Sequence, residues 1–364
     1  MQGFGNKMSK RIGYIDGMRG FTMILVVYSH ICTFCLGDSN IAFNDVLFLF
    51  RLPCFFFISG WLFYGVGREW TGQEATNVMK KKFMVQIVPT LIFLFLLSPP
   101  PAYFHQFGAV KGGYWFTFAL FVFFILYIIS ILPLRLCQGK KADIIMLLVA
   151  FVISMTAYWY DINYYRLSYM LTWQKDILGF LSFITWRYYL FFCLGTLARK
   201  YFPQFLKITG NGIVMAVITL VFFAISQIPQ SDIFIREYFK FSVGGIMGMT
   251  IIFALFRYLY TSSLLSIGHP TSAIIHPTSA FLKFVGTRTL DIYLLHYFFL
   301  PRFLLSNVTD VIPSIPSLLL PVVILLVSLA VVAFCLATSY IIRLSPFLGH
   351  YLFGVKYERL KDNR

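Results

Sequence analysis

The sequence predicts an all-α polytopic membrane protein with about ten transmembrane helices. Three observations carry this prediction: hydrophobic residues make up 59% of the 364 residues, charged residues make up 12%, and the mean hydropathy is +0.77. Soluble domains carry about twice that charged fraction. A soluble globular fold is therefore excluded, and a protein that crosses the membrane several times is indicated.

Each expected helix is an apolar run long enough to cross a hydrocarbon core of about 30 Å. In chain order, these runs are approximately 17–36, 43–66, 83–101, 115–134, 143–160, 185–198, 211–229, 241–260, 284–306 and 318–342. The sixth run is short and the fifth is marginal. We expect residues 1–342 to form one membrane domain and residues 343–364 to form a basic cytoplasmic tail.

The formal net charge of +16 would indicate a nucleic-acid partner in a soluble chain. Here the basic residues cluster in the short segments between apolar runs, which is how orientation in a membrane is encoded. If the N-terminus is cytoplasmic, most of the 30 Lys and Arg residues fall in inner segments. The pattern predicts cytoplasmic termini, a place in the cytoplasmic membrane, and anionic lipids rather than nucleic acid as a partner.

The first apolar run carries two ionisable residues, Arg19 and His30. Eleven residues correspond to about three helical turns, so both side chains lie on one face, about 16 Å apart along the axis. An ionisable side chain inside the membrane costs roughly 2.5 to 3.5 kcal/mol and is a candidate functional residue. A snorkelling Arg19, oriented by Asp16, and a merely hydrogen-bonded His30 remain alternatives.

Two further intramembrane residues, Arg51 and His296, fall at the same estimated depth as His30, at or beyond the midplane. Pro53 is expected to kink the helix that carries Arg51. Arg288 and Asp291 are expected to form a structural ion pair. Arg187 is expected at the outer interface.

Three hydrophilic segments are long enough to do more than connect helices. Residues 67–82 end in Lys80, Lys81 and Lys82, which favour either a surface anchor or a phosphate-binding site. Residues 161–184 are aromatic and are expected outside, as an interfacial belt or an acceptor groove. Residues 261–283 contain a short tandem copy beginning at His269 and His276, and their prolines predict a loop.

Four motifs then resemble one family. Residues 15–20 (IDGMRG), followed by the apolar run that ends in His30, resemble the opening of the acyltransferase 3 family of integral membrane acyltransferases, whose signature is an Arg, ten residues and a His. Residues 53–60 (PCFFFISG), 114–116 (YWF) and 286–296 (GTRTLDIYLLH) resemble later family motifs in the same order. Tyr114 stands where the family commonly has a His, which weakens a role for that loop.

The resemblance implies an O-acyltransferase that takes an acyl group, usually acetyl, from cytoplasmic acyl-CoA. It implies a glycan or lipid-linked sugar hydroxyl as the acceptor, without the extracytoplasmic domain that some members append. Such a transfer needs a base, a group that stabilises the oxyanion and a cationic site for the donor's phosphates. We assign these roles to His30, to Arg51, and to Arg19 with Lys80, Lys81 and Lys82, and expect His296 to be a further site residue.

The sequence contains no GxSxG motif and no His, Cys or Asp cluster at metal-ligand spacing, so we expect neither a serine nucleophile nor a metal. A function from another class stays open. A secondary transporter or flippase for an anionic or glycan substrate would use the same buried Arg and His residues.

Overall fold

The computed structural model describes residues 12–37, 43–65, 70–97, 113–134, 140–163, 172–229, 231, 233–265, 272–301, 316 and 319–355. Every regular element within these ranges is a helix. The α-helices are α1 (Gly13–Phe34), α2 (Asn44–Phe63), α3 (Gly72–Lys82), α4 (Val88–Leu97), α6 (Trp115–Leu134), α7 (Lys140–Asn163), α8 (Thr172–Phe180), α9 (Tyr189–Lys200), α10 (Phe202–Thr209), α11 (Gly212–Ser226), α12 (Phe234–Leu265), α13 (Ser272–Thr287), α14 (Thr289–Phe299), α16 (Leu320–Arg343) and α17 (Pro346–Phe353). A π-helical turn, η1 (Phe83–Ile87), joins α3 to α4, and a 3-10 helix, η4 (Phe183–Tyr188), leads into α9. The all-α prediction is confirmed for this part of the chain.

Five helices, α2, α6, α7, α12 and α16, are long and apolar enough to cross a membrane. The count rises to seven if two bent pairs are each one span: α8 with η4 and α9, bent by 45°, and α10 with α11, bent by 76°. These helices support the prediction that the chain is a membrane protein. Ten spans and cytoplasmic termini remain predictions.

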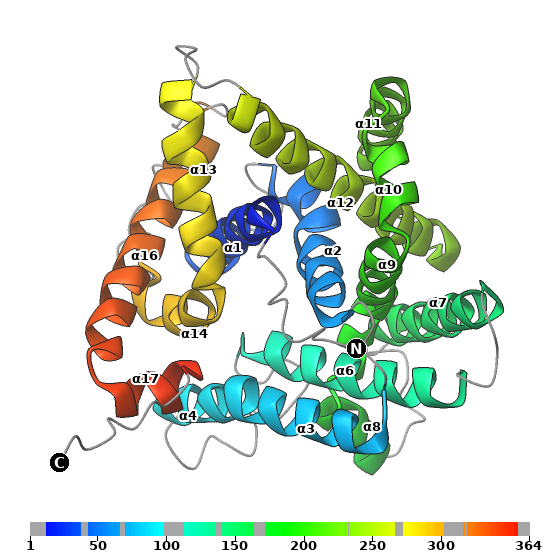
Figure 1. Ribbon diagram of the computed structural model, residues 1–364, viewed down its shortest axis with the longest axis horizontal. Helices are drawn as coiled ribbons and strands as arrows, with labels where there is room; N and C mark the ends of the chain where they lie inside the picture. Colours follow the sequence, from blue (N-terminus) through cyan, green and yellow to red (C-terminus); the bar gives the residue numbers. More distant parts are fainter. Residues whose placement is uncertain are drawn as a thin grey trace, which may run out of the picture.

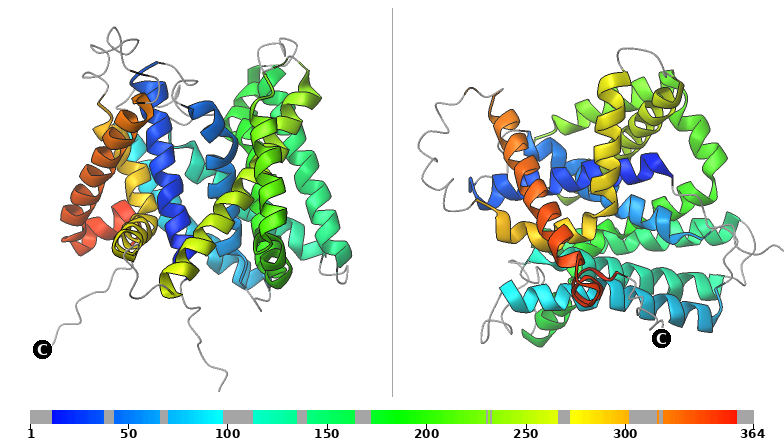
Figure 2. Two further views of the ribbon diagram at one scale, coloured as in Figure 1. Left: turned by 90° about the horizontal axis from the view of Figure 1, so that it is seen from above. Right: turned by 60° about the vertical axis from the view of Figure 1, so that its left-hand side comes forward.

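Helices α1 and α2 lie side by side near the centre of the molecule (Figure 1). Helices α13, α14 and α16 pack against α1, and α9 and α12 pack against α2. The turned view in Figure 2 shows the orange helix α16 beside the blue helix α1. Helices α3, α4 and α6 form a further side of the assembly (Figure 1). The two helices that carry Arg19, His30 and Arg51 are therefore enclosed by others.

Paired glycines bring the central helices into close contact with their neighbours. A Cβ atom at Gly20 of α1 would lie 2.0 Å from the carbonyl oxygen of Leu282 in α13. A Cβ atom at Gly195 of α9 would lie 2.0 Å from the carbonyl oxygen of Phe57 in α2. Small residues are the usual means by which membrane helices approach this closely. These two crossings fix α1 and α2 in the bundle.

Two of the hydrophilic segments, including the one predicted as a loop, are partly helical. The lysine triplet belongs to α3, whose first turn is capped when the Thr71 side chain accepts a hydrogen bond from Glu74 N at 3.1 Å. The tandem copy lies partly outside the described residues, but α13 begins at Ser272 and continues through Pro277. Because Pro277 is only the sixth residue of α13, the hydrogen bond that it removes is near the helix start, and packing of α13 on α1 outweighs that loss.

Candidate functional site

The two histidines predicted at one depth are in direct contact. Nδ1 of His30, on α1, lies 2.7 Å from Nε2 of His296, on α14. Their rings are nearly parallel, with centroids 4.9 Å apart and an interplanar angle of 20°. His296 is fully buried, whereas His30 is partly exposed. The structure therefore joins two residues that are 266 positions apart in the chain.

The other nitrogen of His296 determines the protonation pattern of the pair. His296 Nδ1 lies 2.7 Å from the carbonyl oxygen of Tyr293 and 3.1 Å from that of Ile292. Carbonyl oxygens only accept, so this Nδ1 carries a proton, and Nε2 of the neutral ring is an acceptor. His30 must then donate from Nδ1, which leaves the lone pair of its own ring on Nε2. A neutral His30 in this tautomer has the protonation state of a general base.

Tyrosine hydroxyls hold the backbone next to this pair. The Tyr114 hydroxyl donates to the carbonyl oxygen of Leu294 at 2.8 Å. The hydroxyls of Tyr293 and Tyr297 donate to the carbonyl oxygen of Gly113 at 3.1 and 3.2 Å. These bonds fix α14, the helix of His296, against the start of α6. Although Tyr114 departs from the family pattern, it is a structural part of the site.

A cavity of about 480 Å³ opens beside His30. It is bordered by α1, α2, α6, α14 and the two irregular turns η1 and η4. Its charged lining residues are Arg19, Arg51, Lys82 and Arg187, and no Asp or Glu is among the described residues that line it. The charged groups that the described lining presents to a ligand are therefore all positive.

Arg19 and Lys82 lie at one end of this cavity, which we call the Arg19 end. Tyr14 of α1 and Trp61 of α2 both pack on Phe253, with ring centroids 5.6 and 5.4 Å away. The start of α1 and the end of α2 therefore lie together. The Nζ atom of Lys82 is 5.9 Å from the ring centre of Phe63, at the same end of α2.

Arg19 is held by two neighbours on its own end of the cavity. Its Nη2 donates to Thr289 Oγ1 at 2.8 Å, and its Nη1 lies 3.8 Å from Asp16 Oδ1. The expected orienting role of Asp16 thus agrees with the geometry. Thr289, the first residue of α14, was not identified from the sequence.

The structure separates the three consecutive lysines. Lys80 and Lys81 are exposed on α3 and do not line the cavity, whereas Lys82 does. Lys82 is the last residue before η1, and its Nζ lies 4.6 Å from the ring centre of Phe124. Gln86 of η1 also lines the cavity, and its buried Oε1 has no hydrogen-bond partner.

Arg51 lies in the other part of the cavity, which we call the Arg51 end. Its side chain is 8% exposed. Nη1 donates to Asn44 Oδ1 at 2.8 Å, and the guanidinium carbon lies 5.2 Å from the ring centre of Phe48. Helix α2 continues through Pro53 as one α-helix. Arg51 thus reaches the cavity beside His30, as the estimated depths predicted.

Arg187 was expected at the outer interface but lies in the cavity wall. It forms an ion pair through Nη1 with Asp161 of α7. Its guanidinium carbon is 5.2 Å from the ring centre of Tyr188 and 5.8 Å from that of Phe241. A residue ranked as peripheral is therefore part of the site, and its place in a short 3-10 helix gave no periodic signal by which to find it.

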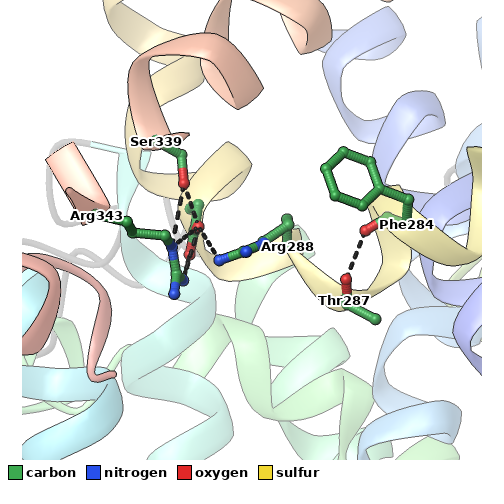
Figure 3. Close-up of polar contacts among 6 residues, drawn as sticks. Phe284, Thr287, Arg288, Ser339 and Arg343 are labelled. Carbon is green, nitrogen blue, oxygen red and sulfur yellow. Dashed lines mark hydrogen bonds and ion pairs between the residues drawn. The ribbon is translucent and has the colours of Figure 1, made fainter. Parts of the chain in front are cut away.

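The predicted ion pair of Arg288 and Asp291 is present, but it is the weaker of two. Arg288 Nη1 lies 3.7 Å from Asp291, whereas Arg343 of α16 contacts both carboxylate oxygens at 2.8 Å. The Ser339 hydroxyl donates to the same carboxylate at 2.5 Å. Figure 3 shows Ser339, Arg343 and Arg288 converging on this group. The cluster ties α14 to α16, which agrees with the structural interpretation.

No group of three or more His, Cys, Asp or Glu residues suited to a metal ion occurs in the part of the chain that the structure describes. A comparison with protein families finds a match over residues 12–340 to the family model described as an acyltransferase domain. No curated protein and no solved structure matches the chain significantly.

Proposed function

Because this chain belongs to the acyltransferase domain family, whose model spans residues 12–340, we propose that it moves an acyl group from acyl-CoA to a hydroxyl of a glycan or lipid-linked sugar. Acetyl-CoA is the donor that we propose, and the cytoplasmic membrane is the proposed location. The observation that carries the proposal is the His30–His296 pair on a cavity lined by four cations and no described carboxylate.

The proposed reaction begins with removal of a proton. His30 Nε2 accepts the proton of the acceptor hydroxyl as its oxygen attacks the carbonyl carbon of the thioester. His296 is a positioning residue, because its Nε2 accepts a hydrogen bond from the Nδ1–H group of His30 and thereby fixes the tautomer of His30. When the tetrahedral intermediate collapses, the C–S bond breaks and the imidazolium returns the proton to the leaving CoA sulfur.

The cations of the cavity suit the negative charges of this reaction. Arg51 is assigned to the oxyanion that forms on the thioester carbonyl, because a buried guanidinium interacts strongly with developing charge. Arg19 and Lys82 are assigned to the phosphates of CoA. Arg19 lies about 16 Å from His30 along α1, so an extended pantetheine arm spans the interval between phosphates and thioester.

The acceptor is assigned to the Arg51 end, where aromatic side chains line the cavity. Trp115 and Tyr188 line the wall, with ring centroids 6.0 Å apart. Flat aromatic faces suit the apolar faces of sugar rings. The buried Ser29 Oγ, next to His30, also lines the cavity and has no hydrogen-bond partner, so a ligand hydroxyl would satisfy it.

The test compares surface glycans by mass spectrometry in cells with and without the protein. We expect acyl groups that depend on the wild-type chain and are lost in a His30→Ala variant that still inserts. His350→Ala, on α17 and outside the cavity lining, is the matched control and should keep activity. Unmodified glycans in the wild type would overturn the proposal, and a change in glycan amount without acylation would favour a flippase.

A further inference from the structure

The cavity contains more fixed positive charge than the acyl donor accounts for. Arg19 and Lys82 lie at the Arg19 end, where the phosphates of CoA are assigned. Phe63, which contacts Lys82, is twelve residues beyond Arg51 on α2, and this corresponds to about 18 Å of helix. A donor whose thioester reaches His30 therefore keeps its phosphates away from Arg51.

Arg51 differs from the other arginines of the cavity in its partners. Arg19 has Asp16 at 3.8 Å, and Arg187 is paired with Asp161. Arg51 has an amide oxygen and an aromatic ring instead, and no carboxylate of the described residues lies within 4.0 Å of it. A buried cation without a counter-charge is strongly unfavourable. An oxyanion that exists only during the reaction does not offset this cost in the resting protein.

Arg187 lies at the same level of the bundle as Arg51. The glycine contacts between α2 and α9 place Gly60 beside Phe192 and Gly195 beside Phe57. Arg51 precedes the α2 residues of this crossing by six and nine positions, and Arg187 precedes the α9 residues by five and eight, so both lie roughly 10 Å before the crossing. Tyr188 also lines the cavity, and its ring centre is 5.2 Å from the Arg187 guanidinium carbon.

The cavity wall that contains Arg187 also contains aromatic side chains, which suit a sugar ring. Trp115 and Tyr188 face the same cavity. Arg187 uses Nη1 for Asp161, which leaves the rest of its five-donor guanidinium to face other groups. A guanidinium presents two parallel N–H groups to a carboxylate or phosphate, the geometry that such anions prefer.

We infer that the acceptor is anionic, and that its phosphate or carboxylate group binds between Arg51 and Arg187 at the Arg51 end of the cavity. The inference rests on the proposed function, because it assigns the acceptor to this end. It adds a substrate class: a sugar phosphate or an acidic sugar rather than a neutral glycan. The bound anion supplies the counter-charge of Arg51, so that in this inference Arg51 binds the acceptor instead of the oxyanion, and the sugar ring lies against Trp115.

The experiment measures binding of small probes to the full-length protein in nanodiscs, with CoA present at saturation to occupy the Arg19 end. Glucose 1-phosphate, glucuronate and glucose are compared by calorimetry. We expect at least one anionic probe to bind at least about tenfold more tightly than glucose. The better of the two anionic probes identifies whether phosphate or carboxylate is the source of the charge.

Variants then locate the site. Arg51→Gln and Arg187→Gln should each weaken the anionic probe about tenfold while CoA affinity stays unchanged. Arg199→Gln is the matched control, since Arg199 stacks on Trp61, 5.3 Å away, and does not line the cavity. Arg51→Lys keeps the charge but not the two parallel N–H groups, so it should bind the anionic probe more tightly than Arg51→Gln does, which guards against a fold defect in the Gln variant.

Each outcome decides one of the two proposals. Equal binding of glucose and the anions, no binding of either anion, or unchanged binding in both Gln variants would overturn the anionic acceptor. Failure of CoA to bind the wild type would instead overturn the assignment of the acyl donor. The three probes would then be compared in the absence of CoA, and that comparison would still test the anionic acceptor.

Discussion

His296 offers the sharpest test of how the site works, because the structure assigns it to orienting His30 rather than to the substrate. The 2.7 Å contact between His30 Nδ1 and His296 Nε2 is the interaction to remove. His296→Phe keeps a ring of similar size in a fully buried position but has no acceptor for the Nδ1 proton. His296→Gln keeps an acceptor, because its amide oxygen reaches a similar place.

The magnitude follows from one buried hydrogen bond. Leaving such a donor unsatisfied costs about 1 to 3 kcal/mol, and if this cost falls on the reactive tautomer, kcat drops roughly 5- to 160-fold. We expect His296→Phe to lie in this range and His296→Gln to lose less. KM for the acyl donor should stay the same in both, because the donor phosphates are assigned to the Arg19 end.

The assay is the initial rate of label transfer from acetyl-CoA in membranes that contain equal amounts of each variant. His350→Phe is the control, since this histidine bonds to the carbonyl oxygen of Val355 and does not line the cavity. Full activity of His296→Phe, or an equal loss in the Phe and Gln variants, would refute the positioning argument.

Three further changes test other parts of the molecule. Lys82→Ala should weaken equilibrium binding of CoA about tenfold, and more at low salt. A Lys80→Ala, Lys81→Ala double variant should bind CoA normally, because both side chains are exposed and do not line the cavity. Equal losses of CoA affinity in the two variants would place the phosphates on the exposed face of α3. Asp291→Asn should lower the free energy of unfolding by about 2 to 4 kcal/mol, since the partly exposed arginines around it lose their shared counter-charge; an unchanged unfolding temperature would contradict this. Tyr114→Phe should cost about 1 kcal/mol of stability through its lost 2.8 Å bond, measured in the same way, with no change in CoA affinity.

The sequence was sufficient for the parts of this protein that depend on one helix at a time. Composition identified a helical membrane protein, and the eleven-residue spacing placed Arg19 and His30 on one face, where both line the cavity. The depth estimate brought His30 and Arg51 to the same cavity. Helical periodicity is a property of a single segment, so a single sequence carries it.

Contacts between helices were not available from the same reasoning. Nothing in the spacing of one helix indicates that His30 meets His296 rather than another polar residue, because that depends on how α1 and α14 cross. The lysine triplet was treated as one group, but consecutive residues of a helix point in different directions, and only Lys82 of the three lines the cavity. Arg187 was expected at the outer interface, and nothing in its short segment indicated which helices it would face.

The presence or absence of a nearby acid distinguishes the arginines of this protein more clearly than their estimated depth in the membrane does. Arg288 and Arg343 share Asp291, and Arg187 has Asp161, so each contributes to the bundle whether or not a ligand is bound. Arg51 has only an amide and a ring among the described residues. Of the arginines that line the cavity, Arg19 and Arg187 have an acid nearby, whereas Arg51 has none among the described residues, so an anion that enters the cavity stabilises it. Arg51 is therefore the residue at which binding of an anionic acceptor and stability of the membrane domain should be coupled: at one concentration, an anionic probe should raise the unfolding temperature of the wild type more than that of Arg51→Gln.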